Sequence, residues 1–92
     1  MDLHREILHI LCERPDAPVD YVAIFMFLNT VAGGHYQERA TEDELRQALH
    51  RLLHDGHVQA RNPDGELVLQ PVPGVTFCYY AVTAAGRAAA LA

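Results

Sequence analysis

The amino-acid sequence predicts an α+β fold of three helices, an antiparallel hairpin of two or three strands and a short C-terminal helix. Apolar residues recur at helical spacing in the first half of the chain, and the spacing becomes strand-like after Gly56. Two turn sequences then separate short alternating segments, and an Ala-rich stretch follows them. With 92 residues, 50% of them hydrophobic, the chain has enough apolar surface for one core. We therefore expect residues 1–92 to form a single domain.

The first two predicted helices have caps at their starts. Asp2 can cap a helix over residues 3–14, which Pro15 ends because the residue before a proline avoids helical dihedrals. Its apolar residues repeat at helical spacing: Leu3, Ile7, Ile10 and Leu11. The second helix, YVAIFMFLNTV, follows the cap Asp20 and ends at the glycine pair 33–34. It is apolar on almost every side, so it lies inside the core or is partly covered by another chain.

The second helix also predicts a homodimer. Its run of large apolar residues exceeds what one buried face of so small a domain requires. Apolar surface that stays exposed in this way marks contacts between chains. The predicted dimer interface consists of Ile24, Phe25, Phe27 and Leu28.

The third predicted helix, residues 41–55, has the clearest boundaries. Thr41 and Glu44 have the spacing of a capping box, in which each side chain accepts the backbone N–H of the other residue. Gly56 can adopt the left-handed conformation that ends a helix. One apolar stripe faces the core and consists of Leu45, Leu49, Leu52 and Leu53. The opposite, solvent-exposed face carries Asp43, Arg46, Gln47, His50 and His54.

After the third helix, apolar and polar residues alternate as they do in strands. VQAR (58–61) and ELVLQ (66–70) alternate on either side of an NPDG turn. PVPG forms a second turn, and VTFCYYAV (75–82) is the longest predicted strand. Thr83 then caps a short helix over residues 84–91.

The stretches LRQALHRLLHDGHV and YYAVTAAGRAAALA resemble the bacterial winged helix-turn-helix regulators of the PadR and MarR type. In these proteins the third helix runs into a Gly-hydrophobic step, and the last strand carries a Tyr-x-hydrophobic-Thr-x-x-Gly-Arg signature. The match covers residues 45–58 and 80–91, and the order of elements agrees elsewhere. The chain departs from the PadR pattern at Arg46, where a Tyr is common, and at Leu53, where an acid is common. The signature residues are Tyr80, Val82, Thr83, Gly86 and Arg87.

This resemblance implies a winged-helix fold, with the hairpin as the wing, and a transcriptional regulator that binds double-stranded DNA. The third helix, residues 41–55, would enter the major groove. Arg binds guanine and Gln binds adenine through paired hydrogen bonds. The residues implied to face bases are therefore Arg46, Gln47 and His50. The residues implied to contact phosphates are Arg39, Arg51, Arg61 and Asn62.

The charge of the chain favours a different function. Its formal net charge is −5, which opposes binding to a polyanion. Glu42, Asp43 and Glu44 occupy the first turn of the third helix, where they suit the helix dipole but repel phosphates. The alternative prediction is an acidic winged-helix module that binds another protein and does not bind DNA. The apolar second helix and the Ala-rich end of the chain favour this alternative.

The residues that most enzymes and cofactor sites need are missing or unsuitably spaced. The chain has no Lys and no Ser, which removes lysine-containing phosphate loops and the commonest hydroxyl nucleophile. We therefore predict no enzymatic activity and no cofactor. His50 and His54 lie one helical turn apart and His57 follows closely, but no carboxylate or thiolate at a suitable spacing completes a metal site. We expect solvated histidines and no bound metal.

The sequence also predicts a cytoplasmic protein. No apolar run approaches the ~20 residues that span a bilayer, and the start MDLHREILHILCERP lacks the cleavage site of a signal peptide. Cys12 and Cys78 lack metal-type spacing. We expect both to be reduced thiols that pack as small apolar residues.

Overall fold

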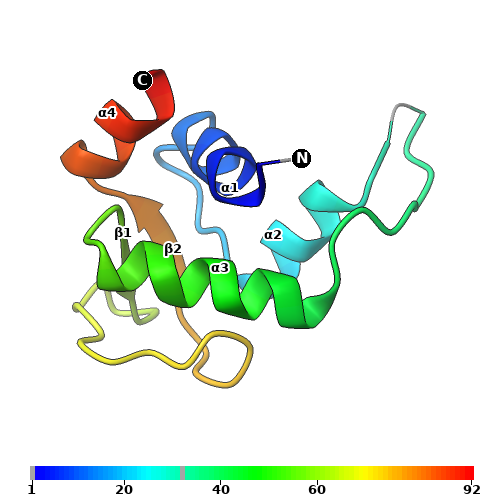
Figure 1. Cartoon of the computed structure of the whole chain (residues 1–92). Helices are drawn as coiled ribbons and strands as arrows, with labels where there is room; N and C mark the ends of the chain where they lie inside the picture. The colour runs from blue at the N-terminus through cyan, green and yellow to red at the C-terminus, as the bar shows by residue number, and fades with distance from the viewer. Residues whose placement is uncertain (1, 32) are drawn as a thin grey trace.

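The computed structural model describes residues 2–31 and 33–92. Over these residues it has four helices and one two-stranded antiparallel sheet (Figure 1). The predicted α+β class is confirmed, and so is the predicted order of three helices, a hairpin and a final helix. The elements in chain order are α1 (Leu3–Cys12), α2 (Tyr21–Leu28), α3 (Glu42–His54), β1 (Val58–Arg61), β2 (Tyr79–Val82) and α4 (Ala84–Leu91).

Each helix begins at the residue predicted to cap it. The side chains of Asp2 and Asp20 accept backbone N–H groups in the first turns of α1 and α2. Thr41 Oγ1 accepts the Glu44 N–H at 3.2 Å, and Glu44 Oε1 accepts the Thr41 N–H at 2.9 Å, which completes the capping box. The pKa of the Glu44 carboxyl is lowered, first by the hydrogen bond from the Thr41 backbone N–H and then by the Thr41 side chain, because both stabilise its charged form. At the start of α4, Thr83 Oγ1 accepts the Gly86 N–H at 3.1 Å.

The predicted end of α2 is wrong, because the helix stops at Leu28 and not at the glycine pair. Asn29 follows and is fully buried. Its side-chain Oδ1 accepts the backbone N–H groups of Arg39 and Ala40 at 2.6 and 2.9 Å. Its backbone carbonyl accepts the Gln37 N–H at 2.7 Å. The helix ends here because a distant segment uses the hydrogen-bonding groups of Asn29.

The predicted strand at 66–70 is also wrong. β1 and β2 pair along all four of their residues, and they alone form the sheet of the described chain. The 66–70 segment makes a single bridge, between Leu67 and Arg61, and the Val68 N–H donates to the Ala60 carbonyl at 2.9 Å. It leaves the sheet after this contact because a proline-containing turn follows directly. The hairpin therefore has two strands.

The last strand starts later than predicted, at Tyr79 and not at Val75. The N–H groups of Val75 and Thr76 both donate to the Val72 carbonyl at 2.9 Å. The Val72 N–H donates to Thr76 Oγ1, also at 2.9 Å. A closed turn therefore occupies the residues that the alternating pattern assigned to a strand.

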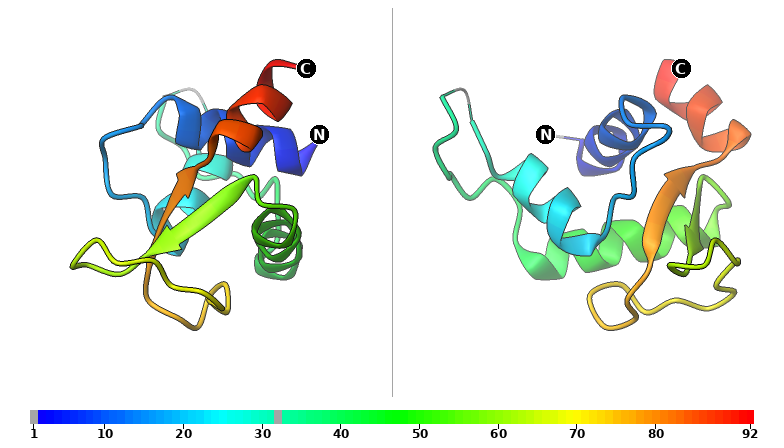
Figure 2. Two further views of the ribbon diagram at one scale, coloured as in Figure 1. Left: turned by 90° about the vertical axis from the view of Figure 1, so that its left-hand side faces the viewer. Right: turned by 180° about the vertical axis from the view of Figure 1, so that it is seen from behind.

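The core surrounds α1, which contacts α2, α3, α4 and β2. Figures 1 and 2 show α4 beside α1 at one end of the molecule, while α3 runs along one side. Among the described residues, none of the helices combines the length and the apolar character needed to cross a membrane. The largest buried side chains of the core are Ile7, Leu11, Ile24, Leu28, Leu45, Leu49 and Leu52.

Candidate functional site

α3 carries three of the residues implied to contact DNA, on the side that faces away from the core. The buried stripe of the helix consists of Leu45, Ala48, Leu49 and Leu52. Because a helix repeats every 3.6 residues, this stripe directs Gln47 and His50 outward. Both are exposed, and Arg46 lies at one edge of the same face. Figure 1 shows the segment between β1 and β2 running beneath α3.

The Arg46 guanidinium is paired within its own helix. Its Nη2 donates to Asp43 Oδ1, one turn earlier. This hydrogen bond is the main reason that the pKa of Arg46 is raised. The stem of the side chain packs at Gly74, where an added Cβ would lie 3.3 Å from Arg46 Cδ. Arg46 would have to release Asp43 before it could bind a base.

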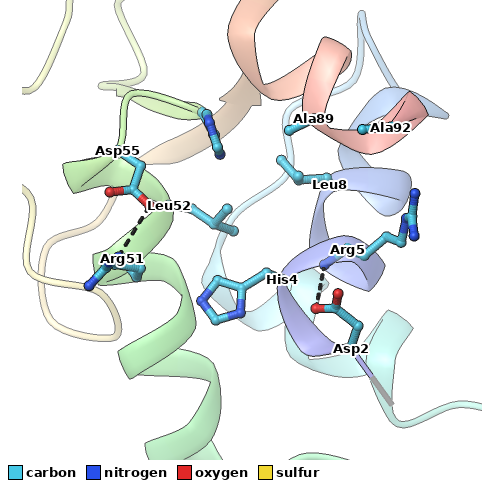
Figure 3. Close-up of a pocket in the computed structure, with 10 residues that line it drawn as sticks. Asp2, His4, Arg5, Leu8, Arg51, Leu52, Asp55, Ala89 and Ala92 are labelled. Carbon is cyan, nitrogen blue, oxygen red and sulfur yellow. Dashed lines mark hydrogen bonds and ion pairs between the residues drawn. The ribbon is translucent and has the colours of Figure 1, made fainter.

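Arg51 lies on a different flank of α3 from Arg46 and is exposed. Its Nε is 3.2 Å from Asp55 Oδ2, one turn later in the helix. Both side chains line an open hollow between the ends of α1, α3 and α4, together with His4 and Arg5 (Figure 3). The acids Asp2 and Asp55 balance the two arginines of this hollow. With His neutral, the described residues that line the hollow therefore carry no net positive charge that would attract a phosphate.

Arg61 and Asn62 were implied to contact phosphates from the wing turn. Both make hydrogen bonds within that turn and stabilise it. Arg61 Nη1 donates to the Gly65 carbonyl at 2.7 Å. Asn62 Oδ1 accepts the N–H groups of Asp64 and Glu66 at 3.0 and 2.9 Å. Figure 2 shows this turn extending from the sheet on the side away from α3. The two wing residues are therefore separate from Arg46, Gln47 and His50.

The remaining implied contact, Arg39, lies in the segment before α3 and is exposed. The predicted DNA contacts thus occupy several separate places: the outer face of α3, the flank that carries Arg51, the wing turn and the segment before α3. Residues 41–55 carry four acids and two arginines, a net charge of −2 with His neutral. Among the described residues, no continuous basic strip joins the predicted contacts.

One surface was not predicted. Residues 67–77, here called the apolar loop, carry five large apolar side chains that are more than half exposed. Alternation in this part of the sequence suggested strands, which would bury about half of these residues. The signal that identifies the loop is the lack of charge between Glu66 and Arg87. The exposed residues are Leu67, Leu69, Val72, Val75 and Phe77.

The apolar loop is held between α3 and the start of α2. One groove separates it from α3 and is lined by His50, Leu53, His54 and residues 69–73. A smaller groove of about 150 Å³ separates it from α2 and is lined by Asp20, Tyr21, Val22 and residues 74–78.

The contacts of its turn hold the apolar loop in place. Pro73 is buried, and Gly74 has a φ of +83° that side chains rarely adopt. A Cβ at Gly74 would lie 3.4 Å from Tyr21 Cζ. Tyr21 in turn donates its hydroxyl hydrogen to the Glu42 carbonyl at 3.2 Å. The loop therefore presents its apolar side chains from a backbone that contacts both helices.

The residues predicted to form a dimer interface are in different environments. Ile24 and Leu28 are fully buried in the core of the chain itself, so they have no surface for a second copy. Phe25 is half-buried and packs against the core. Phe27 is 41% exposed, and the Arg14 guanidinium lies 3.9 Å from the centroid of its ring. Of the predicted set, Phe27 has the most surface available to a partner.

The predicted absence of a metal site concerns the histidines of α3. Over residues 2–31 and 33–92, no three His, Cys, Asp or Glu side chains are close enough together to hold a metal ion. His50 and His54 line the groove beside the apolar loop. Cys78 is buried and Cys12 is half-buried, and both are free thiols.

Comparisons with known proteins leave the family of the chain open. No protein-family model, curated protein or solved structure matches it. The resemblance to winged helix-turn-helix regulators therefore depends on the residues quoted above and on the order of the elements.

Proposed function

We propose that this chain is a protein-binding module, and that the apolar loop is its binding surface. The observation that carries the proposal is the exposure of Leu69, Val75 and Phe77, which are 88%, 78% and 62% accessible. An exposed apolar patch on a small domain marks a site of interaction with another macromolecule. Loops on protein surfaces usually expose polar residues to solvent. Exposed apolar side chains such as these are stabilised when a partner covers them and removes them from water.

The charges beside the loop define the chemistry of the partner. Asp20 lines the groove between the loop and α2. The pKa of Tyr21 in the same groove is raised, first by burial and then by the negative charge of Glu42, while Arg46 opposes the shift. This rim is acidic. A partner with apolar anchor residues and flanking Arg or Lys side chains complements it.

The electrostatics of α3 favour a protein over DNA. Non-specific DNA affinity comes from unpaired basic side chains that replace counterions on phosphates. On α3, Arg46 and Arg51 each have a carboxylate partner in the same helix. Glu42 and Glu44 add unbalanced negative charge in the first turn. A duplex approaching this face meets net repulsion.

Photo-crosslinking tests the proposal. A photoreactive residue at Leu69 or Val75 is expected to give one discrete covalent adduct in cells of the source organism. The same residue at Ala88, which is exposed on α4 outside the loop, is the matched control and is expected to give none. Phe77→Asp should abolish the adduct, because it places a charge in the apolar contact. Phe77 is 62% exposed, so this variant is expected to stay folded, as a thermal unfolding curve would verify.

The adduct must then be reproduced with purified proteins. The partner identified by mass spectrometry should bind the wild-type chain in solution and bind Phe77→Asp at least about tenfold more weakly. Equal adducts from Leu69 and Ala88, or binding that Phe77→Asp leaves unchanged, would show that the apolar loop is not the binding surface.

A second candidate function is binding of double-stranded DNA through α3. The specific observation in its favour is that Gln47 and His50 are exposed at the centre of the outer face of α3, directly before the hairpin. On this alternative, Arg46→Ala should cost about 1–3 kcal/mol of binding free energy and relax the sequence preference.

Titration with mixed-sequence duplex DNA at low salt separates the two functions. The protein-binding proposal predicts no association, either for the wild-type chain or for the double variant Glu42→Gln, Asp43→Asn. The DNA alternative predicts association that falls steeply with salt and tightens in the double variant, since repulsion near the phosphates is reduced. Binding with this salt dependence would replace the proposed function with the alternative.

A further inference from the structure

The outward side of α2 is an uncharged surface that the core does not use. Val22 and Met26 lie one turn apart and are 65% and 45% exposed, and Phe27 extends the surface around the helix. The sequence has no Asp, Glu or Arg between Asp20 and Glu38. Two copies of this surface can therefore meet without like-charge repulsion at their centre.

A hairpin arm adjoins this surface. Its described residues are 30–31 and 33–36, with a bridge between Thr30 and Tyr36. Figures 1 and 2 show the arm projecting beyond the C-terminal end of α2, away from the rest of the molecule. Tyr36 on the arm is 55% exposed. The buried Asn29 accepts hydrogen bonds from residues 37, 39 and 40, so the base of the arm is held in place.

We propose that two copies of this chain form a two-fold dimer in which the α2 helices pack antiparallel. The charges at the two ends of the surface argue for a second copy. Asp20 supplies a carboxylate at the start of α2, and Arg14 supplies a guanidinium over Phe27 near its end. Arg14 Nη1 also lies 3.5 Å from the exposed Glu13 carboxylate, so a contact with Asp20 of the second copy would add to this pair. In a two-fold contact the same patch faces itself, so the Asp20 end of each copy lies toward the Arg14 end of the other.

The position of the arm also fits an antiparallel contact between the α2 helices. Because it projects at the end of α2, an antiparallel contact places it over the start of the other copy's α2 and covers Tyr36. A partner with basic flanks would face Asp20 but would also meet the charge of Arg14, so it fits this surface less well than a second copy does. The dimer surface shares Asp20 and Val22 with the groove beside the apolar loop. Met26 lies outside that groove, so substitutions at Met26 test the dimer and substitutions at Phe77 test the proposed function.

Sedimentation or light scattering tests the dimer. At tens of micromolar the wild-type chain is expected to have twice the mass of one 10.2 kDa chain. Met26→Glu should shift it to the monomer, raising the dissociation constant at least about tenfold, because it puts two like charges at the centre of the contact. Leu91→Glu is the matched control: Leu91 is 85% exposed on α4, and this variant should stay dimeric.

Two further variants test the arrangement. Met26→Cys is expected to form a disulfide-linked dimer under mild oxidation, whereas Leu91→Cys and the wild-type chain are not. Asp20→Asn keeps the helix cap, since Asn caps as well as Asp, but should weaken the dimer several-fold by removing the cross-pairing charge. A monomeric wild type, or a dimer that survives Met26→Glu, would overturn the proposal. Leu69 and Val75 are intact in every variant, so failure of the dimer and failure of the apolar-loop proposal give different results.

Discussion

Gly86→Ala is expected to destabilise the protein by about 3 kcal/mol, the upper end for overpacking a buried position. Helix propensity alone predicts the opposite sign, because Ala is about 1 kcal/mol better than Gly inside a helix. We expect destabilisation because α4 lies very close to the segment that follows α3. A Cβ on Gly86 would lie 1.9 Å from the His57 carbonyl oxygen and 2.9 Å from Val82 Cγ2.

The backbone at His57 cannot move aside easily. Its carbonyl accepts the Thr83 N–H at 3.0 Å, and its own N–H donates to the Leu52 carbonyl at 3.0 Å. Thr83 Oγ1 also donates to the Gly56 carbonyl at 2.6 Å. Relief of the clash would therefore break the hydrogen bonds that fix the start of α4.

Urea unfolding of Gly86→Ala and of a control glycine measures this effect. Gly65 is the control because its φ is +86° and nothing lies within 4 Å of an added Cβ. Gly65→Ala should cost only about 1–2 kcal/mol, the strain of a left-handed conformation. If Gly86→Ala proves as stable as the wild type, α4 does not pack this closely against the chain.

Asn29→Ala is also expected to cost about 3 kcal/mol. Asn29 is completely buried, and its side-chain oxygen accepts two backbone N–H groups, those of Arg39 and Ala40. Its Nδ2 donates to the Phe25 carbonyl at 2.9 Å. The substitution removes the partner of the Ala40 N–H in a place that water reaches poorly, because Ala40 is 1% exposed.

Asn62→Ala is the matched control for this prediction. Asn62 Oδ1 also accepts two backbone N–H groups, but in the exposed wing turn, where water replaces the lost bonds. It should cost about 1 kcal/mol or less. Hydrogen exchange would add detail, since the amides of residues 39 and 40 should lose protection in Asn29→Ala. Equal costs for the two substitutions would contradict the structural role assigned to Asn29.

Asn29→Ala also bears on the proposed dimer. Asn29 joins the end of α2 to the segment before α3, so its loss would release the base of the arm. The dimer should then weaken together with the fold. Met26→Glu, by contrast, should weaken the dimer and leave unfolding nearly unchanged, because Met26 is 45% exposed.

The helix starts and the capping box could be predicted because they depend on residues three or four positions apart. Asp2, Asp20, Thr41 and Thr83 bond to N–H groups in their own first turns, so neighbouring residues specify them. Gly56 ends α3 with a φ of 74°, as its position after the apolar stripe predicts.

Part of the candidate site also depends on residues that are close together in the sequence. Arg46 pairs with a carboxylate three residues before it, and Arg51 with one four residues after it. Pairs at these spacings form on one helix face, so sequence spacing alone predicts that both guanidinium groups have partners.

The sequence by itself determined the α+β class, the order of the elements, the caps and the acidic character of α3. Only the tertiary structure decided where α2 ends, whether residues 66–70 join the sheet, and which face of α2 remains exposed. Those outcomes depend on contacts between distant segments: Asn29 with residues 37–40, and Tyr21 and Arg46 with Gly74. An alternating pattern states that every second residue can be buried, but burial requires a neighbouring surface. For Leu69 and Val75 the fold supplies none, and the side chains stay in solvent.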